Sequence, residues 1–361
     1  MPNYNPRNER IKREYFRLLK EADQMGDATI DGVRKALRRF EDYSELADFA
    51  SLDKEQAIGF KKRLAASNTS RSGAVLSPAT VLTTIHAVQV FFRWLAREPG
   101  YRSKIRAADI RYFNLSRKDV ATGRAARTKK VPTLQQIRAV ILAMPDATEI
   151  ERRDRALIAF TIVTGMRDSA IASLRLKHVD LEERLVIQDP REVNTKFSKR
   201  IETFFFPVGD EIEQIVIEWV RELREVKLYG ENDPVFPRTR VAPDGELLFA
   251  AQGLEPVLWS SAGPIRRVFK EAFALAGLSY FTPHSFRSTL ATYGQRICRS
   301  PEQLKAWSQN LGHESLLTTF TSYGHVPLHR QGELVRNATT QDGSDSKLDR
   351  LMQMVENMQA R

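Results

Sequence analysis

The sequence TPHSFRSTLATYG, residues 282–294, is the most informative part of this chain. It reads as the start of a helix, and it places His284 and Arg287 three positions apart. Because residues at i and i+3 lie on one face of a helix, both side chains can converge on one ligand, while Phe286 points the other way into the core. A guanidinium binds two phosphate oxygens at once and does not lose its proton. We therefore expect this helix to carry part of a phosphate site.

Two further stretches carry residues of the same kind: VTGMR at 163–167 and LGHESLLTTFTSYGHV at 311–326. Gly165 ends an apolar helix, and a glycine at that place directs the following Arg167 into a cleft. His313 follows a glycine turn, and Tyr323 lies ten residues further on among polar residues. Each residue alone has an ordinary structural explanation, so only the set is informative.

As a set, these residues match what a metal-free enzyme needs to break a phosphodiester with a tyrosine. Two arginines can neutralise the phosphate as its negative charge grows, two histidines can move protons or donate hydrogen bonds, and one phenol can attack. A phenol with a pKa of about 10 is a poor nucleophile at neutral pH, so it needs a base or cationic surroundings. We find no P-loop and no zinc-ligand set in the sequence, so we expect neither a nucleotide nor a metal, and no cofactor.

The composition favours a folded protein of two domains. The chain has 361 residues, of which 42% are hydrophobic and 28% charged, as in ordinary globular proteins. No run of about 18 apolar residues occurs, so no membrane span is expected, and the first residues do not read as a secretory signal. A single cysteine, Cys298, excludes an internal disulfide framework. We expect a cytoplasmic, nucleoid-associated protein.

The net charge of +11 is concentrated in one segment. Residues 51–131 hold 17 Lys and Arg against 5 Asp and Glu, whereas the rest of the chain is nearly balanced. A local surplus of this size is typical of a surface that binds a polyanion such as DNA. The side chains expected to contact DNA are Arg93, Arg97, Arg124, Arg127, Lys129 and Lys130.

Hydrophobic periodicity predicts an N-terminal helical domain over 1–116. Helices are expected over residues 8–24, 29–43, 54–66 and 79–96. Residues 117–131 lack apolar periodicity and are rich in Lys and Arg, so they read as a basic linker.

The second domain is expected over 132–335. It begins with helices over 134–144, 149–163 and 168–174, and two β segments at 184–188 and 200–206 then flank a hairpin that carries Lys196 and Lys199. The remainder reads as mainly helical, with a Pro- and Gly-rich excursion at 230–264. The tail, 336–361, carries Leu348, Leu351, Val355 and Met358 at heptad-like spacing, which we interpret as a partner-docking helix.

The order of these residues and motifs resembles the tyrosine recombinase (phage integrase) family over about 132–327, and the N-terminal helices look like that family's core-binding domain. The resemblance implies a mainly α protein with a small β-sheet or hairpin. A helical core-binding (SAM-like) domain and an α+β catalytic domain would form a C-shaped DNA clamp. It implies a site-specific recombinase that acts on double-stranded DNA as a homotetramer on synapsed sites, through a Holliday junction. Accessory DNA-bending or directionality proteins are possible partners.

The resemblance also implies a role for each residue of the set. Arg167 and Arg287 would clamp the scissile phosphate, and Tyr323 would attack it to give a 3′-phosphotyrosyl link and a free 5′-hydroxyl. Lys196 would protonate the leaving 5′-oxygen, with Lys199 as the alternative, because the register of the hairpin is open. The remaining two residues are histidines: His284 would act as acid and base, and His313 would form a hydrogen bond with the phosphate.

Three features depart from the family pattern. Ala170 stands three positions after Arg167, where the family often has an acidic residue, and Asp168 lies on another helical face. The step from His313 to Tyr323 is ten residues, one more than is common, and the tail after Tyr323 has 38 residues. None of these changes removes a catalytic group.

Two other functions are compatible with parts of the set. A type IB topoisomerase shares the arginine, lysine, histidine and tyrosine chemistry, but that family usually has lysine at the position of His284. A DNA-binding protein without catalysis is disfavoured because every catalytic position is filled.

Overall fold

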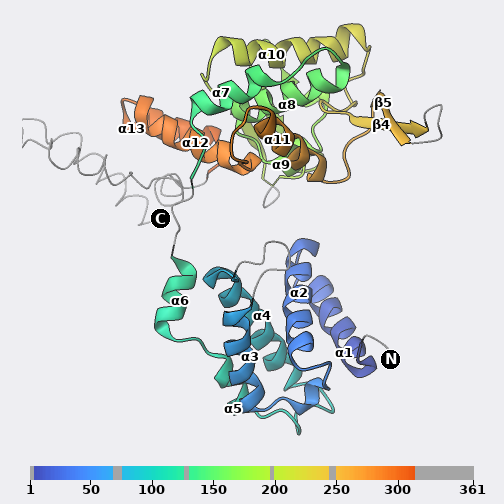
Figure 1. Ribbon diagram of the computed structural model, residues 1–361, viewed down its shortest axis with the longest axis vertical. Helices are drawn as coiled ribbons and strands as arrows, with labels where there is room; N and C mark the ends of the chain where they lie inside the picture. Colours follow the sequence, from blue (N-terminus) through green and yellow to red (C-terminus); the bar gives the residue numbers. More distant parts are fainter. Residues whose placement is uncertain (1–3, 68–74, 126–129, 196–198, 244–248, 314–361) are drawn as a thin grey trace, which may run out of the picture. The chain divides into compact units, whose positions relative to one another are not determined.

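The computed structural model describes residues 4–67, 75–125, 130–195, 199–243 and 249–313. The chain divides into two compact units, Met1–Arg127 and Thr128–Arg361, which we call the first and the second unit. The described part is mainly helical, with small antiparallel sheets, as the sequence predicted (Figure 1). No described helix is long and apolar enough to cross a membrane.

The described part of the first unit is all helical. Its helices are α1 (Pro6–Arg17), α2 (Asp27–Tyr43), α3 (Lys54–Ala66), α4 (Pro78–Leu95), α5 (Ala107–Ile110) and α6 (Arg117–Arg124), with the shorter turns η1 (Leu18–Ala22), η2 (Phe49–Ser51) and η3 (Arg111–Phe113). Ser77 accepts a hydrogen bond from the backbone N–H of Thr80 and Pro78 opens the helix, which fixes the start of α4 where the sequence placed it.

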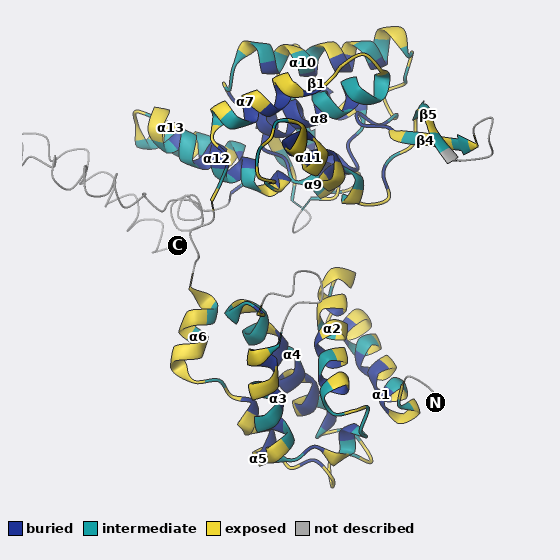
Figure 2. Ribbon diagram, in the orientation of Figure 1, coloured by how far each residue is buried: buried dark blue, intermediate teal, exposed yellow. Residues whose placement is uncertain are grey.

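Aromatic side chains fill the core of the first unit. Phe40 contacts Phe60 and Phe92 edge to face, with ring centroids 5.1 and 5.0 Å apart. All three are 1% exposed or less, so each contributes the full hydrophobic gain of a buried ring. Figure 2 shows the buried residues on the inward faces of these helices. Arg93 and Arg97 lie on the exposed side of α4 and beyond its end, as its apolar stripe predicted.

The structure differs from the expected linker at 117–131. Residues Arg117–Arg124 form α6, which Ser116 caps by accepting from the N–H of Asp119 at 3.1 Å. The helix has no buried residue and approaches α4 through Gly123, where a Cβ would lie 3.0 Å from Leu82. A contact made through a glycine produces no hydrophobic periodicity, so the sequence does not predict this helix.

The second unit is built around a helix that is buried along most of its length. Its elements are α7 (Leu134–Ala143), α8 (Glu149–Thr164), α9 (Asp168–Ile171), η4 (Leu176–His178), β1 (Val179–Asp180), β2 (Leu185–Gln188), β3 (Ile201–Phe204), α10 (Asp210–Arg221), η6 (Glu222–Val226), β4 (Arg238–Pro243), β5 (Phe249–Glu255), α11 (Gly263–Leu275), α12 (Pro283–Ile297) and α13 (Pro301–Asn310). Every residue of α8 from Ala156 to Thr164 is buried (Figure 2), so α8 forms the centre of this core.

Two small antiparallel sheets complete the second unit. The first has the order β1–β2–β3, with Leu185 opposite Phe204 and Gln188 opposite Ile201. The second, β4–β5, falls in the Pro- and Gly-rich stretch for which the sequence predicts no strands, and it projects from the helices (Figure 1). Its base is held from α8, because Glu149 accepts from the backbone N–H of Leu254 at 2.8 Å. Such a tertiary contact leaves no local signal.

Helices α12 and α13 pack through Gly294. A Cβ at Gly294 would lie 2.4 Å from Nε1 of Trp307, which donates to the carbonyl of Leu290 at 3.0 Å. We predict that Gly294→Ala lowers the free energy of unfolding by about 1–3 kcal/mol, because the indole must move and its hydrogen bond is strained. Denaturant unfolding of the full chain measures this.

The matched control is Gly32→Ala in α2, where nothing lies within 4 Å of the added Cβ. Alanine favours an exposed helix, so this variant is expected to be stabilised by up to about 1 kcal/mol. Equal effects of the two substitutions would contradict the packing described for α12 and α13.

Candidate active site

Arg287 brings the three sequence stretches together. From the first turns of α12, its Nη1 donates to the carbonyl of Gly165 and its Nη2 to the carbonyl of Leu311. Nη2 also lies 3.3 Å from Nε2 of His313. The residue is only 3% exposed, so these bonds are formed away from water, where a hydrogen bond to a charged donor is strong. One buried guanidinium therefore connects α12 with the end of α8 and with the turn after α13.

Gly165 is needed at the end of α8 for two reasons. Its φ of 60° is left-handed, and a Cβ there would lie 2.8 Å from Leu290 of α12. The chain then turns so that Arg167 forms the N-cap of α9 and is half-buried. The predicted ending of the apolar helix at a glycine is confirmed.

Within the described residues, Asp168 forms its ion pair with a residue other than Arg167. Its Oδ2 accepts from Nε of Arg266 on α11 at 2.7 Å, and Ala170 is buried. The carboxylate next to the first arginine is therefore engaged by a different helix, which agrees with the departure noted in the sequence.

His313 is a buried imidazole held at a tight turn. Gly312, with a φ of 67°, lies against Ile201 of β3, and the N–H of His313 donates to the carbonyl of Ser308 at 3.1 Å. Burial, together with the charges of Arg287, Arg167 and His284, lowers the pKa of His313 to about 4. The imidazole is therefore neutral at neutral pH. Because arginine can only donate, Nε2 accepts from Arg287 and Nδ1 carries the proton.

The structure thus gathers four of the predicted residues in one neighbourhood: Arg167, His284, Arg287 and His313. His284 is the second residue of α12, and its side chain is exposed where that of Arg287 is buried. An exposed imidazole that shares the neighbourhood of His313 with two guanidiniums can meet a ligand from solvent. Tyr323 and Lys196 lie outside the described residues.

The first arm of the β2–β3 hairpin is attached to the residues that follow α9. After β2, the backbone N–H of Asn194 donates to Oγ of Ser173 at 2.9 Å. Oε2 of Glu192 forms a hydrogen bond with Nε2 of His178, also at 2.9 Å. Lys199, the alternative lysine, is described and half-buried at the start of the second arm.

The second arm is attached to the turn that carries His313. The side chain of Asn310 accepts from the N–H of Phe204 at 2.7 Å and donates to the carbonyl of the same residue at 2.9 Å. Sequence reasoning missed Asn310. An asparagine at a helix end signals a turn, but its partner is 106 positions away, and no local pattern indicates that pairing.

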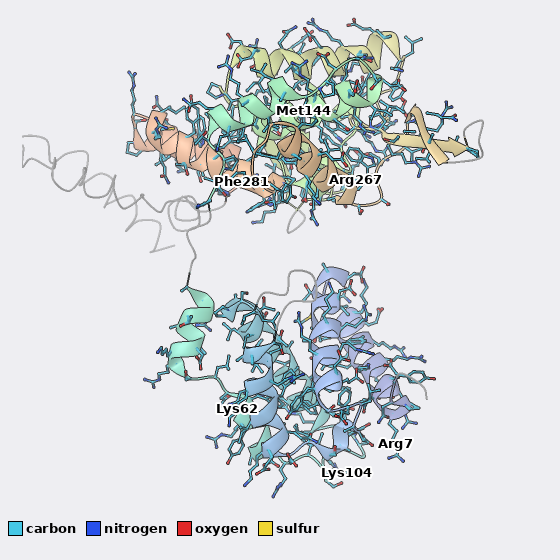
Figure 3. The ribbon with its side chains drawn as sticks, in the orientation of Figure 1. Arg7, Lys62, Lys104, Met144, Arg267 and Phe281 are labelled. Carbon is cyan, nitrogen blue, oxygen red and sulfur yellow. The ribbon has the colours of Figure 1, made fainter. Side chains whose placement is uncertain are left out.

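The residues expected to contact DNA occupy exposed positions where they are described. Arg93 and Arg97 line a hollow of about 220 Å³ together with Arg111. Arg124 and Lys130 are exposed, whereas Arg127 and Lys129 lie outside the described residues. Basic side chains such as Lys62 and Lys104 extend from the surface of the same unit (Figure 3).

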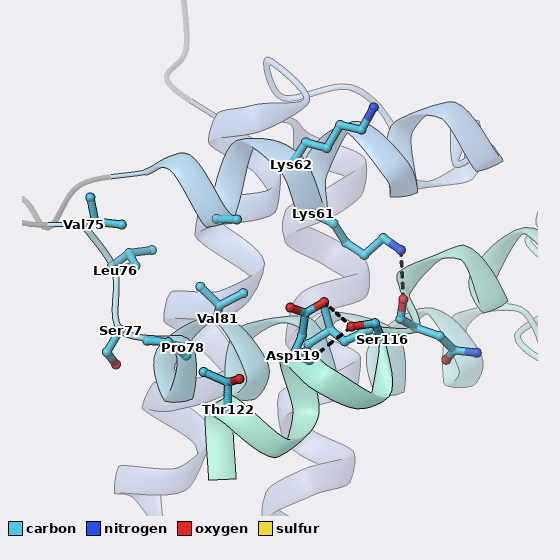
Figure 4. Close-up of a pocket in the computed structure, with 13 residues that line it drawn as sticks. Lys61, Lys62, Val75, Leu76, Ser77, Pro78, Val81, Ser116, Asp119 and Thr122 are labelled. Atoms are coloured by element: carbon cyan, nitrogen blue, oxygen red, sulfur yellow. Dashed lines mark hydrogen bonds between the residues drawn. The ribbon is translucent and has the colours of Figure 1, made fainter. Parts of the chain in front are cut away.

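A larger hollow, of about 850 Å³, lies in the first unit and is lined by residues of α3, α4 and α6, among them Lys61, Val81 and Asp119. Lys61 reaches across it and donates to the carbonyl of Asn114 at 2.9 Å (Figure 4). It contains none of the residues gathered around His313. In the described part of the chain, no three His, Cys, Asp or Glu side chains are grouped so as to hold a metal ion.

The chain is similar to a known protein family and to individual proteins. The model of the phage integrase family matches residues 131–329. Tyrosine recombinase XerC of Lactobacillus leichmannii is 27% identical over 261 residues, which are 71% of this chain and 75% of that protein. Tyrosine recombinase XerD of Neisseria meningitidis serogroup B is 29% identical over 201 residues, which are 55% of this chain and 60% of that protein.

Two solved structures have a similar fold. A lambda integrase dimer bound to a COC′ core site matches with a TM-score of 0.59 and 15% identity, covering 86% of this chain and 93% of that one. The XerH site-specific recombinase bound to a palindromic difH substrate, in a post-cleavage complex, matches with a TM-score of 0.58 and 18% identity, covering 93% of this chain and 90% of that one.

The lowered pKa of His313 predicts a pH-dependent stability. Between pH 6.5 and about 4 the unfolded chain binds a proton that folded His313 does not, so the free energy of unfolding falls as the pH falls through this window. We expect His313→Gln to lose less stability than the wild type over the same window, as measured by denaturant unfolding. Parallel pH profiles for the two proteins would contradict the burial of a neutral imidazole.

Proposed function

The chain belongs to the phage integrase family of tyrosine recombinases, enzymes of site-specific DNA cleavage and religation, and we propose that it works through a 3′-phosphotyrosyl intermediate and a Holliday junction, without ATP or metal. The observation that carries this proposal is the convergence of Arg167, His284 and Arg287 around His313. A pair of guanidiniums beside imidazoles suits a dianionic transition state better than it suits a neutral substrate.

Arg167 and Arg287 are proposed to hold the non-bridging oxygens of the scissile phosphate. A guanidinium carries five N–H donors, and the bonds from Arg287 to two carbonyls and to Nε2 of His313 use three of them. Arg287 can therefore connect the backbone and still donate to a phosphate. Arg167, half-buried at a helix start, approaches the same ligand with its side chain partly in solvent.

The two histidines are proposed to have different roles because their surroundings differ. His313 is buried and neutral, with its proton on Nδ1, so it suits a hydrogen bond to a phosphate oxygen. His284 is exposed at the start of α12 and suits proton transfer to and from the reacting oxygens. An exposed imidazole can exchange its proton with solvent between the two steps.

In the cleavage step, Oη of Tyr323 attacks the phosphorus and its proton passes to a base, for which His284 is the candidate. The bond from phosphorus to the 5′-oxygen breaks, and Lys196, or Lys199 in the alternative assignment, protonates the leaving oxygen. The products are a 3′-phosphotyrosyl link and a 5′-hydroxyl. Because the ester is kept, the reverse reaction with another 5′-hydroxyl reseals the strand without ATP.

The proposed partner is double-stranded DNA with specific recombination sites, bound by a homotetramer on synapsed sites. The basic surplus of residues 51–131 and the exposed Arg93, Arg97 and Arg124 support DNA contact by the first unit. Both solved structures of similar fold are described as bound to their DNA sites. We expect the protein to act with the nucleoid in the cytoplasm, with accessory DNA-bending or directionality proteins as further candidates.

A type IB topoisomerase is the alternative with related chemistry. The imidazole of His284 beside Arg287 favours the recombinase, since the topoisomerases usually have lysine there. Recombination between two specific sites, as against relaxation of any supercoiled plasmid, separates the two functions.

Tyr323→Phe is expected to abolish covalent capture of a nicked suicide duplex that carries the recognition site, because the nucleophilic oxygen is removed while the ring is kept. Denaturing gel electrophoresis of the protein–DNA adduct measures this, and gel-shift binding of the same duplex is expected to persist. Tyr229→Phe, which removes a half-buried phenol just after η6, is the matched control and is expected to retain capture. Adduct formed by Tyr323→Phe would exclude Tyr323 as the nucleophile.

A further inference from the structure

We propose that Asn310 is a positioning residue for the general acid: it holds strand β3, and with it the hairpin lysine, in register with the turn that carries His313. The inference rests on the proposed function, because it concerns the same cleavage step. It assigns a role to a residue that belongs to none of the sequence motifs.

The carboxamide of Asn310 acts as a substitute for a neighbouring strand. In the sheet order β1–β2–β3, strand β3 lies at an edge. Asn310 accepts from the N–H of Phe204 and donates to its carbonyl, at 2.7 and 2.9 Å. A carboxamide has its donor and acceptor in one plane, as a peptide group does, so it satisfies both backbone groups of one edge residue.

A second set of bonds continues into the hairpin. Oγ1 of Thr203 donates to the backbone carbonyl of Asn310 at 3.1 Å, and Nε2 of Gln188 on β2 lies 3.3 Å from the same hydroxyl. Thr203 and Gln188 are 2% and 4% exposed. A buried polar chain of this kind is costly to break, and it therefore fixes the relative positions of β2, β3 and the end of α13.

On its other side, Asn310 is joined to the phosphate-binding residues. The carbonyl of the next residue, Leu311, accepts a hydrogen bond from Arg287, and Gly312 and His313 come directly after it in the chain. Ile201, at the start of β3, packs on Gly312, and Lys199 stands two residues before Ile201. Asn310 thus joins the lysine-bearing hairpin to the Arg287–His313 cluster, beside the contact of Ile201 with Gly312.

This placement predicts a selective defect. Loss of the Asn310 bonds displaces the lysine that protonates the 5′-oxygen, while Arg287 keeps its own bonds to Gly165 and Leu311. A displacement of about 1 Å is enough to slow proton transfer strongly. Phosphate binding and attack by the tyrosine are expected to continue.

The test compares two nicked suicide duplexes that differ in one atom, a 5′-oxygen or a 5′-bridging sulfur at the scissile phosphate. A thiol with a pKa of about 8.5 leaves as a thiolate and does not need a proton from an acid. For Asn310→Ala we expect single-turnover cleavage of the oxygen duplex to slow about 10- to 100-fold, with the sulfur duplex cleaved near the wild-type rate. Gln309→Ala, which removes an exposed carboxamide from the neighbouring position, is the matched control and is expected to cleave both duplexes normally.

Asn310→Asp provides a second variant of the same size. It keeps the acceptor for the N–H of Phe204 but sets a carboxylate oxygen against the carbonyl, so we expect the same selective defect in a folded protein. Equal slowing on both duplexes, or no slowing on either, would overturn the role of Asn310. Failure of the wild type to capture either duplex would instead overturn the proposed function.

Discussion

The buried guanidinium of Arg287 is the interaction on which the rest of the site depends. It donates to two backbone carbonyls that lie 122 and 24 positions away in the sequence, at Gly165 and Leu311. A charged group cannot be buried without such partners, because the loss of hydration would cost several kcal/mol. The fold can therefore bury this arginine only when the end of α8 and the turn after α13 are both in place. Stability and the assembly of the site are coupled through one side chain.

The surrounding packing explains why this coupling is rigid. Helix α8 is buried over its second half and ends at Gly165, which fits closely against α12. Helices α12 and α13 meet through Gly294 and Trp307, and β3 is attached to α13 by Asn310. Each joint uses either a glycine that admits a close approach or a side chain that replaces a missing backbone partner. The same joints place two guanidiniums around a neutral imidazole, an arrangement that costs stability unless an anion is bound.

Much of this could be predicted from the sequence because the signals are local. Capping chemistry predicts the start of α4 at Ser77-Pro78 and the end of α8 at Gly165. Helix geometry predicts that His284 and Arg287, at i and i+3, lie on one face. The resemblance to a family joined the separate motifs into one site, and the structure brings four of those residues together. The catalytic role of each remains a prediction.

The features that sequence reasoning missed depend on contacts between distant residues. Asn310 binds a strand more than a hundred positions away, α6 packs through a glycine, and the β4–β5 hairpin is held from α8 by Glu149. None of these interactions leaves a period or a spacing in the sequence. The partner of Asp168 is a similar case, since Arg266 could not be identified without the packing of α11.

The structural role of Arg287 is tested most directly by comparing two variants, Arg287→Lys and Arg167→Lys. Denaturant unfolding measures the free energy of unfolding of each. A lysine cannot donate to two carbonyls in the geometry of a guanidinium fork, so Arg287→Lys is expected to lower the free energy of unfolding by about 2 kcal/mol or more. Arg167 is half-buried and, among the residues that the structure describes, donates to no such pair of backbone carbonyls, so Arg167→Lys is expected to remain close to the wild type. Wild-type stability in Arg287→Lys would contradict the structural role of the guanidinium.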